Sequence, residues 1–416
     1  MDLALGDVLR FAIFSDIHAG VQSHTDTHVF SEPPNSAPKE NPLSDLTDFI
    51  ISRQLKADWV LNPGDLANRA DSGGQIYGWN RLDQIKSALG ASSVFGAVGN
   101  HDLDTHNPVA DPAIILKNVA PPFPTSDLAL NRQYWAEGFY LDDSQEHFRV
   151  LNVNTCADFP PHPGANASPA DLAEYHTLLD RGSISAARLQ AIETRVSSLP
   201  WKPINLALLH HHPVEHQRRE LLKDTYGPMN NGERLLELLE MANHAGRWMV
   251  VHGHKHLPDF NIDGSSGNSP MLLCAASVGG KLWPPVSTVA RNQFHIIEFE
   301  IDNVLGLPRT RGFVTSYAWS FGTGWGTAYP NTGLPARFGF GMIDDYRSLA
   351  AQVLAVVDAK GKKSIRWREI TAALASVEYL GPRDQTLFEA ELKSLGLEPE
   401  RNGDFGLSRI SRKATW

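Results

Sequence analysis

The first hundred residues alternate between short apolar runs and segments in which apolar residues recur every three or four positions. The short runs are rich in β-branched and aromatic residues and end in polar residues or glycine, which is typical of buried strands. The periodic segments are typical of amphipathic helices. The order strand, helix, strand, helix, strand predicts a parallel sheet with crossover helices. The pattern predicts strands over Leu9–Ser15, Trp59–Asn62 and Ser93–Val98, and helices over Leu43–Leu55 and Trp79–Leu89.

The middle of the chain repeats this alternation. Strands are predicted over Phe148–Val153, Ile204–Leu209 and Trp248–His252, and each is followed directly by His, Asn or Gly. Because functional sites collect at the carboxyl ends of strands in α/β sheets, these positions are candidates for chemistry. We expect helices over Ser185–Ser197 and Asn231–Ala242. Two further β-rich stretches, Met271–Cys274 and Gln293–Glu300, predict a second sheet.

The last quarter of the chain changes character. Residues 311 to 340 are rich in glycine and aromatic residues, which predicts irregular loops that leave the main body. Helices are predicted beyond them over Ile343–Val357, Ile365–Tyr379 and Gln385–Leu395, followed by a turn at Asn402-Gly403 between two extended runs. The predicted organisation is a catalytic domain over residues 1–310, a connecting segment over 311–341 and a small, mainly helical module over 342–416.

Bulk composition narrows the class of protein. The chain has 416 residues, of which 42% are hydrophobic and 20% charged, and this balance is typical of a folded globular protein. The first ten residues do not resemble a signal peptide, and no apolar run reaches the roughly 18 residues that a membrane helix needs. Two cysteines are too few for a disulfide framework. We therefore expect a cytoplasmic protein, and the net charge of -10 disfavours a long nucleic acid as its partner.

Five short polar motifs follow the predicted strands, and their residue types suit metal ligation. Carboxylate oxygen, imidazole nitrogen and amide oxygen together suit divalent ions of the first transition row. Two ions about 3.5 to 4 Å apart need a shared carboxylate, and Asp65, which follows a turn-permitting glycine, is the candidate for that bridge. The motifs are Asp16-Ile17-His18, Gly64-Asp65, Gly99-Asn100-His101-Asp102, His210-His211-His212-Pro213 and Gly253-His254-Lys255-His256.

These five motifs, in this order, resemble the pattern of the calcineurin-like metallophosphoesterase superfamily over roughly residues 8 to 300. The resemblance implies an α/β fold in which two sheets and two helical layers form a four-layer α-β-β-α sandwich. It also implies two metal ions. One ion would be held by Asp16, His18, Asp65 and His256, and the other by Asp65, Asn100, His211 and His254.

The resemblance further implies a mechanism. A hydroxide that bridges the two ions would attack phosphorus, His101 would protonate the leaving oxygen, and Asp102 would orient His101. Elementary chemistry agrees, because an alkoxide leaving group needs a proton and histidine delivers one near neutral pH. Manganese, iron and zinc all fit this set of ligands.

Several histidines leave alternatives open. His211 is the predicted ligand because family members place the ligand two residues before the proline, but His210 and His212 are adjacent to it. His24 and His28 either line the substrate cleft or are ordinary loop histidines.

The residue three positions after Asp65 separates this chain from one branch of the superfamily. Purple acid phosphatases carry a tyrosine there, whereas this chain has Asn68. The colour produced by tyrosinate bound to iron is therefore not expected.

The compact forms GDLAN and GNHD resemble those of bacterial phosphodiesterases that act on cyclic nucleotides and glycerophosphodiesters. The expected substrate is a small phosphodiester, with a nucleotide as one candidate. Tyr77, Trp79 and the aromatic residues between Tyr317 and Tyr329 are candidates for stacking on a base. A phosphomonoesterase, a nuclease and a catalytically silent binding scaffold are the alternatives.

The C-terminal module has nearly balanced charge. Three helices and a hairpin would suit a winged-helix-like unit that binds DNA, a lid, or an interaction domain. Because its densest basic cluster is only Lys360, Lys362, Lys363, Arg366 and Arg368, we favour interaction or structural support.

Overall fold

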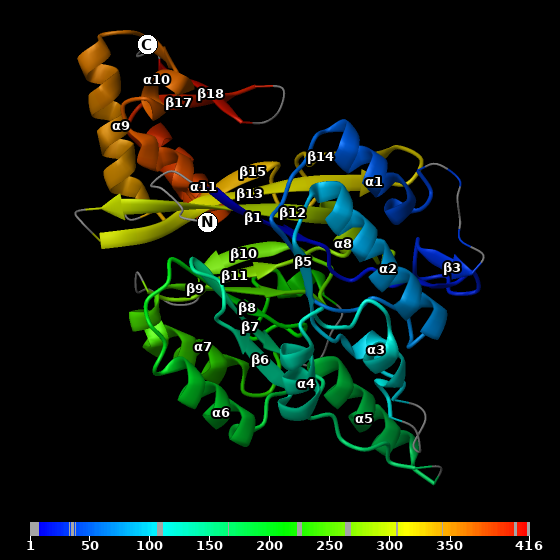
Figure 1. Cartoon of the computed structure of the whole chain (residues 1–416). Helices are drawn as coiled ribbons and strands as arrows, with labels where there is room; N and C mark the ends of the chain where they lie inside the picture. Colours follow the sequence, from blue (N-terminus) through cyan, green and yellow to red (C-terminus); the bar gives the residue numbers. More distant parts are fainter. Residues whose placement is uncertain are drawn as a thin grey trace.

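Two β-sheets lie face to face in the main body of the protein, with helices on both outer sides (Figure 1). The structure is a computed structural model. It describes residues 8–32, 34, 37, 39–105, 111–164, 166–222, 227–262, 268–304, 307–342, 344–402 and 406–413.

The first sheet has seven strands in the order β14-β13-β12-β1-β4-β5, and β15 also pairs with β13. Strands β1, β4 and β5 are parallel, as the alternating pattern predicts, and β12 runs antiparallel to β1. Helices α1 and α2 are the crossovers between the parallel strands. The bounds are β1 Val8–Ile13, β4 Trp59–Asn62, β5 Ser93–Gly96, β12 Asn292–Val304, β13 Leu307–Ser320, β14 Gly324–Thr327, β15 Arg337–Phe340, α1 Pro42–Ser52 and α2 Ser72–Leu89.

The second sheet has six strands in the order β10-β11-β9-β8-β7-β6. Its four central strands are parallel, and the two edge strands are antiparallel to their neighbours. The predicted strand Met271–Cys274 lies here, whereas Gln293–Glu300 lies within β12 of the first sheet. The bounds are β6 Phe139–Asp142, β7 Phe148–Val153, β8 Ile204–Leu208, β9 Trp248–His252, β10 Asp259–Ile262 and β11 Met271–Cys274.

Capping residues mark where helix α1 begins and where helix α2 ends. Asn41 accepts a hydrogen bond from the backbone of Leu43 at the start of α1, and Gly90 ends α2 in the left-handed conformation. Helices α6 and α7 cover the outer face of the second sheet with one buried apolar cluster, which confirms the four-layer arrangement. The remaining helices of the body are α3 Ile114–Asn118, α4 Leu128–Glu137, α5 Pro169–Arg181, α6 Ala186–Val196, α7 Gly232–Met241, α8 Val286–Val289 and the short 3-10 helices η1 Asn100–Asp102, η2 Arg219–Leu221 and η3 Ala242–Ala245.

An aromatic cluster joins the two sheets. The fully buried ring of Phe11 lies 5.3 Å from the rings of Trp59 and Phe148 and 5.7 Å from that of Phe299. Phe148 belongs to the second sheet and the other three to the first. These edge-to-face and stacked contacts therefore fix the position of one sheet on the other.

The Gly- and aromatic-rich stretch after residue 310 is not irregular, which corrects the sequence prediction. It forms most of β13, then β14 and β15, all within the first sheet. Its aromatic residues pack against the body, as in the stack of Tyr317 on Phe294 at 4.9 Å. The pairing of β13 with β12 supplies the backbone hydrogen bonds that overcome the low strand propensity of glycine.

The C-terminal module contains more strand than predicted. The predicted helix Ile365–Tyr379 is instead a strand, a short helix and a 3-10 helix, and β16, β18 and β17 form a three-stranded sheet in that order. The module has its own buried core, built on residues such as Val353 and Phe388. Gly403 of the predicted turn lies outside the described residues. The bounds are α9 Tyr346–Lys360, β16 Ser364–Arg366, α10 Trp367–Thr371, η4 Ala375–Tyr379, α11 Pro382–Ser394, β17 Leu397–Arg401 and β18 Leu407–Arg412.

The module, orange and red in Figure 1, docks on the first sheet through Tyr379. The hydroxyl of Tyr379 donates to Glu300 at 2.6 Å, and its ring lies 5.0 Å from that of Phe313, with the Arg311 guanidinium 4.1 Å from the ring centre. The backbone amide of Gly339 in β15 donates to the carbonyl of Leu380 at 3.1 Å. The division of the chain into three units at 310 and 341 stays a prediction.

Among the described residues, no helix has the length and apolar character required to cross a membrane.

Phe11→Ala is expected to lower the free energy of unfolding by about 3 to 5 kcal/mol, because it opens a cavity between the two sheets. Urea denaturation followed by circular dichroism measures this loss. The matched control is Ile51→Ala on α1, where the side chain is 60% exposed and the expected change is within about 0.5 kcal/mol. A loss below about 1 kcal/mol for Phe11→Ala would contradict this account of how the sheets are joined.

Candidate metal centre

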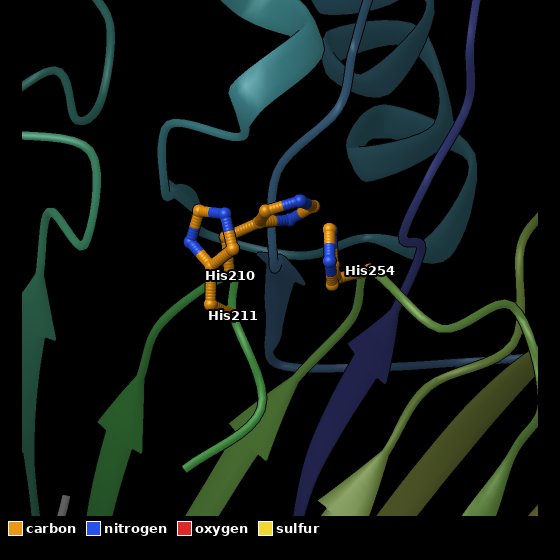
Figure 2. A group of neighbouring side chains, drawn as sticks. All are labelled: His210, His211 and His254. Carbon is orange, nitrogen blue, oxygen red and sulfur yellow. The ribbon is translucent and has the colours of Figure 1, made fainter. Parts of the chain in front are cut away.

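The five polar motifs meet at the carboxyl ends of β1, β4, β5, β8 and β9. Three of these strands belong to the first sheet and two to the second, so the site lies where the edges of the two sheets come together. Figure 2 shows the rings of His210, His211 and His254 gathered just beyond the strand ends. The predicted site residues are thus brought into one place by the fold.

Five of the predicted ligands have left-handed backbone conformations, which are uncommon for residues with a side chain. Hydrogen bonds hold these turns: the amide of Asp16 donates to the carbonyl of Gly64, and the amide of His18 to that of Asp65, both at 3.0 Å. The strained turns aim the side chains back toward one point, and such strain is concentrated at functional sites. The φ angles are 52° at Asp16, 51° at His18, 55° at Asp65, 75° at His254 and 56° at His256.

The first group of donors consists of Asp16, His18, Asp65 and His256. The Nε2 atoms of His18 and His256 are 2.9 Å apart. His256 Nε2 lies 3.4 Å from Asp16 Oδ1, and His18 Nε2 lies 3.5 Å from Asp65 Oδ2 and 3.9 Å from Asp16 Oδ1. Four donors of the predicted types therefore converge.

The second group consists of Asp65, Asn100, His210 and His254. His210 Nε2 lies 3.4 Å from Asp65 Oδ2 and 3.0 Å from Asn100 Oδ1. His254 Nδ1 lies 3.2 Å from the same Asn100 oxygen. This group shares Asp65 with the first.

A single oxygen of Asp65 belongs to both groups. Oδ2 faces His18 on one side and His210 on the other, while Oδ1 accepts the backbone amide of His101 at 2.9 Å. Gly99 allows this close approach, because a Cβ at that position would lie 2.0 Å from Asp65 Oδ1. The carboxylate is thus held in the orientation that a bridging ligand requires.

The donor separations fit metal ions. Ligands about 2.0 to 2.2 Å from one ion, at right or tetrahedral angles, lie about 2.9 to 3.6 Å apart. Apart from the 3.9 Å between His18 and Asp16, the separations above run from 2.9 to 3.5 Å. Asp16 and Asp65 are also 0% and 1% exposed, and carboxylates buried so completely need cationic partners.

The protonation states of His18 and His254 agree with metal ligation. Burial lowers the pKa of His18 to about 3 and that of His254 well below its usual value, so both rings are neutral at pH 7, the form that binds metal. Burial also acts to lower the pKa of His210, but the carboxylates of Asp65 and Asp16 outweigh it and raise that pKa to about 9. A metal ion bound at this place would displace that proton, because imidazole binds metal in its neutral form.

The geometry favours His210 over the predicted His211 as the ligand from the histidine run. The Nδ1 atom of His210 lies 2.8 Å from the carbonyl of Pro63, which directs Nε2 toward Asn100 and Asp65. Both ring nitrogens of His211 face other protein groups, the hydroxyl of Thr155 at 2.7 Å and the carbonyl of Leu179 at 3.1 Å.

The other histidines of the two motifs lie outside the donor groups. His212 and His252 line a small buried cavity together with His216 and Asp259.

His101 lies at the edge of the first group. Its ring makes an edge contact with that of His18 at 4.8 Å between centres. The backbone amide of Arg69 donates to His101 Nδ1 at 3.4 Å, and that of Ala70 donates to the His101 carbonyl at 2.7 Å. A neutral ring that accepts at Nδ1 carries its proton on Nε2, so Nε2 is the donor that His101 offers.

Asp102 contacts the backbone of the Asp65 loop, and its predicted role in orienting His101 stays a prediction. Its carboxylate accepts backbone amides of Asp65 at 2.9 Å and of Gly99 and Ala67 at 3.0 Å, and not the His101 ring. Burial and the nearby Asp65 carboxylate raise the pKa of Asp102 to about 7, while the amides of Ala67 and Gly99 act in the opposite direction. Asp102 therefore holds the Asp65 loop against the turn that carries Asn100.

The sequence pattern did not identify two supporting residues. Asp26 accepts hydrogen bonds from the side chains of Asn68 and Arg69, both at 2.7 Å, and so anchors the turn beside His101. The Nδ2 atom of Asn100 donates to Asp180 at 3.3 Å. Asn68 and Arg69 stand close to Asp65 in the sequence, but nothing in the sequence singles out Asp26 or Asp180.

Two earlier candidates for the substrate cleft have packing roles. Trp79 is buried and donates its indole N–H to the carbonyl of Pro121, so it does not stack on a base. The ring of His28 packs 4.9 Å from that of Trp319.

Comparison with solved structures gives matches at low sequence identity. A dimetal phosphatase from Danio rerio is 14% identical, with a TM-score of 0.44, over 75% of this chain and 96% of that one. A purple acid phosphatase from yellow lupin seeds is 15% identical, with a TM-score of 0.48, over 80% of this chain and 54% of that one. An NAD nucleotidase from Haemophilus influenzae is 10% identical, with a TM-score of 0.33, over 95% and 62%.

No curated protein sequence matches the chain significantly.

The family model of the calcineurin-like phosphoesterases matches residues 9–258. This match covers more than half of the 416 residues and includes all five motifs. The chain therefore belongs to the calcineurin-like phosphoesterase family, whose members are metal-dependent phosphoester hydrolases.

Proposed function

We propose that this protein hydrolyses a small phosphodiester at a centre that holds two metal ions. The observation that carries the proposal is the position of Asp65 Oδ2, 3.5 Å from His18 Nε2 and 3.4 Å from His210 Nε2. One carboxylate oxygen is thus shared by two sets of donors. We propose Asp16, His18, Asp65 and His256 as the first set of ligands and Asp65, Asn100, His210 and His254 as the second.

The residues around the centre have separate tasks. The ions, when bound, supply a water of lowered pKa and neutralise charge on the phosphoryl oxygens. Asp65 fixes the spacing of the two sets, and Asp102 fixes Asp65 through its backbone amide. His101 presents Nε2 beside the first set; when protonated on both nitrogens, it would give the Nε2 proton to the leaving oxygen of an ester and return to the neutral ring.

A phosphodiester suits this arrangement better than the alternatives. Its alkoxide leaving group needs both charge neutralisation and a proton, and the site offers groups for each. A phosphomonoester would use the same groups and is the second candidate. The net charge of -10 disfavours a nuclease, and the intact donor sets disfavour a silent scaffold.

Manganese, iron and zinc all suit oxygen and imidazole donors of this kind. The side chain of Asn68, at the position of the purple acid phosphatase tyrosine, is bonded to Asp26. We therefore expect no tyrosinate colour with iron.

We propose that the C-terminal module gives structural support or binds a protein partner, consistent with its docking on the first sheet through Tyr379.

Asp65→Ala is expected to lower hydrolysis of bis(4-nitrophenyl) phosphate with added manganese by at least about 100-fold and to remove bound metal, because both donor sets lose a ligand. Asp48→Asn, at an exposed site on α1, is the control and should keep full activity. Full activity of Asp65→Ala would refute the proposed centre.

His210→Ala and His211→Ala should separate the two candidate ligands. We expect His210→Ala to bind one manganese ion per chain instead of two, and His211→Ala to keep both, because both nitrogens of His211 already face protein groups. Metal content is measured by mass spectrometry after gel filtration. The reverse result would restore the sequence-based choice of His211.

His101→Ala is expected to keep both ions but to lower kcat about 10²- to 10⁴-fold on alkyl esters. The loss should be much smaller on 4-nitrophenyl esters, whose leaving group needs no proton. Steady-state kinetics on a matched pair of esters provides the measurement. An equal loss on both would argue against His101 as the acid.

A further inference from the structure

A cavity of about 340 Å³ is lined by residues that directly follow the turn Asn100–Asp102 and by residues between 154 and 162. It is within the size range of small-molecule sites in proteins. The side chains that matter for its chemistry are Thr105, Trp135, Asn154, Phe159, His162 and Tyr175.

Two links connect the walls of the cavity with the metal centre. Leu103 and Thr105 follow the turn that carries Asn100 and His101. Phe159 makes an edge contact at 6.0 Å between ring centres with His211, the neighbour of His210. An ester group that extends from a phosphate at the centre toward the cavity would follow this turn.

Helix α5 contacts both the Asn100 turn and the wall of the cavity. Tyr175 near its middle donates to the carbonyl of Thr105 at 3.1 Å, and Asp180 near its end accepts from Asn100 at 3.3 Å. One rigid helix thus supports both a metal ligand and a wall of the cavity.

The walls suit a flat ring with polar edges. Trp135, Phe159 and Tyr175 are the aromatic residues of its lining, and the ammonium of Lys117 lies 5.3 Å from the centre of the Trp135 ring. Asn154 accepts the backbone amide of Cys156 at 3.0 Å through its oxygen, so its NH2 group is the donor it offers. An alkyl chain would leave such polar groups without partners, which costs affinity.

Charge excludes a second phosphate from the cavity. Asp104 and Asp111 both line it, and the one lysine of the wall, Lys117, is paired with Asp111. The balance is acidic, so a neutral group is favoured over an anion. A ring that is neutral, flat and polar at its edge is the chemistry of a nucleobase.

We propose that this cavity binds the nucleobase of a nucleoside phosphodiester whose phosphate lies at the metal centre. The proposal rests on the proposed function and names the substrate class. Base stacking on aromatic side chains would supply much of the selectivity.

The test compares two esters with the same leaving group, thymidine 5′-(4-nitrophenyl phosphate) and methyl 4-nitrophenyl phosphate. We expect wild-type kcat/KM to be at least about tenfold higher for the thymidine ester. Ala157→Trp, which adds bulk at an exposed position of the wall, should abolish this preference and leave the methyl ester unchanged. Phe159→Ala should reduce the preference in the same way.

Ala129→Trp on α4 is the matched control, because Ala129 is exposed and does not line the cavity. It should keep the preference for the thymidine ester. Equal rates on the two esters in the wild type, with no effect of Ala157→Trp, would overturn the base site and leave the proposed hydrolysis intact.

A binding measurement separates failure of the base site from failure of the proposed function. Thymidine and adenosine should quench the fluorescence of Trp135 with or without metal, and Trp135→Phe should remove that signal while Ala157→Trp prevents binding. If wild-type protein hydrolyses neither ester but shows this quenching, the base site stands and the proposed function fails. If the wild-type protein shows no hydrolysis and no quenching, both the base site and the proposed function are overturned.

Discussion

One oxygen of the Asp65 carboxylate is shared by the two groups of candidate metal ligands, and much of the surrounding structure serves to hold it. Oδ2 faces His18 and His210, Oδ1 accepts the amide of His101, and Asp102 accepts the amide of Asp65 itself. With 1% of its surface exposed, this charge is stable only with cations or charged histidines around it. Because the Asp65 carboxylate is buried, it needs positive charge beside it, and a bound metal ion would supply that charge.

The position of the Asp65 carboxylate among its partners also depends on how the two sheets pack. Asp65 follows β4 of the first sheet, whereas His210 and His254 follow β8 and β9 of the second. A shift of one sheet over the other would separate the donors by more than an ion can span. The aromatic contacts of Phe11 with Trp59 and Phe148 oppose such a shift, so the core beneath the site sets its metal geometry.

Different residues surround the metal centre and line the proposed base cavity. His101 and the turn anchored by Asp26 lie next to the first set of donors, while Phe159 and Tyr175 line the proposed base cavity. The reacting group and the proposed binding group therefore involve different side chains. Because of this separation, substitutions in the cavity can change the selectivity for substrates without changing the groups that act on the phosphate.

The sequence by itself determined the parallel strands, the helices between them and the donors at the strand ends, because apolar periodicity and residue type are local properties. Only the tertiary structure decided features that depend on distant partners. The spacing to the proline favoured His211, whereas the contacts with Pro63, Thr155 and Leu179 favour His210. The glycine-rich stretch after residue 310 becomes strand because β12 pairs with it, and Asp102 contacts backbone amides because the Asp65 loop folds over it. Hydrogen bonds between segments far apart in the chain leave no periodic trace in the sequence.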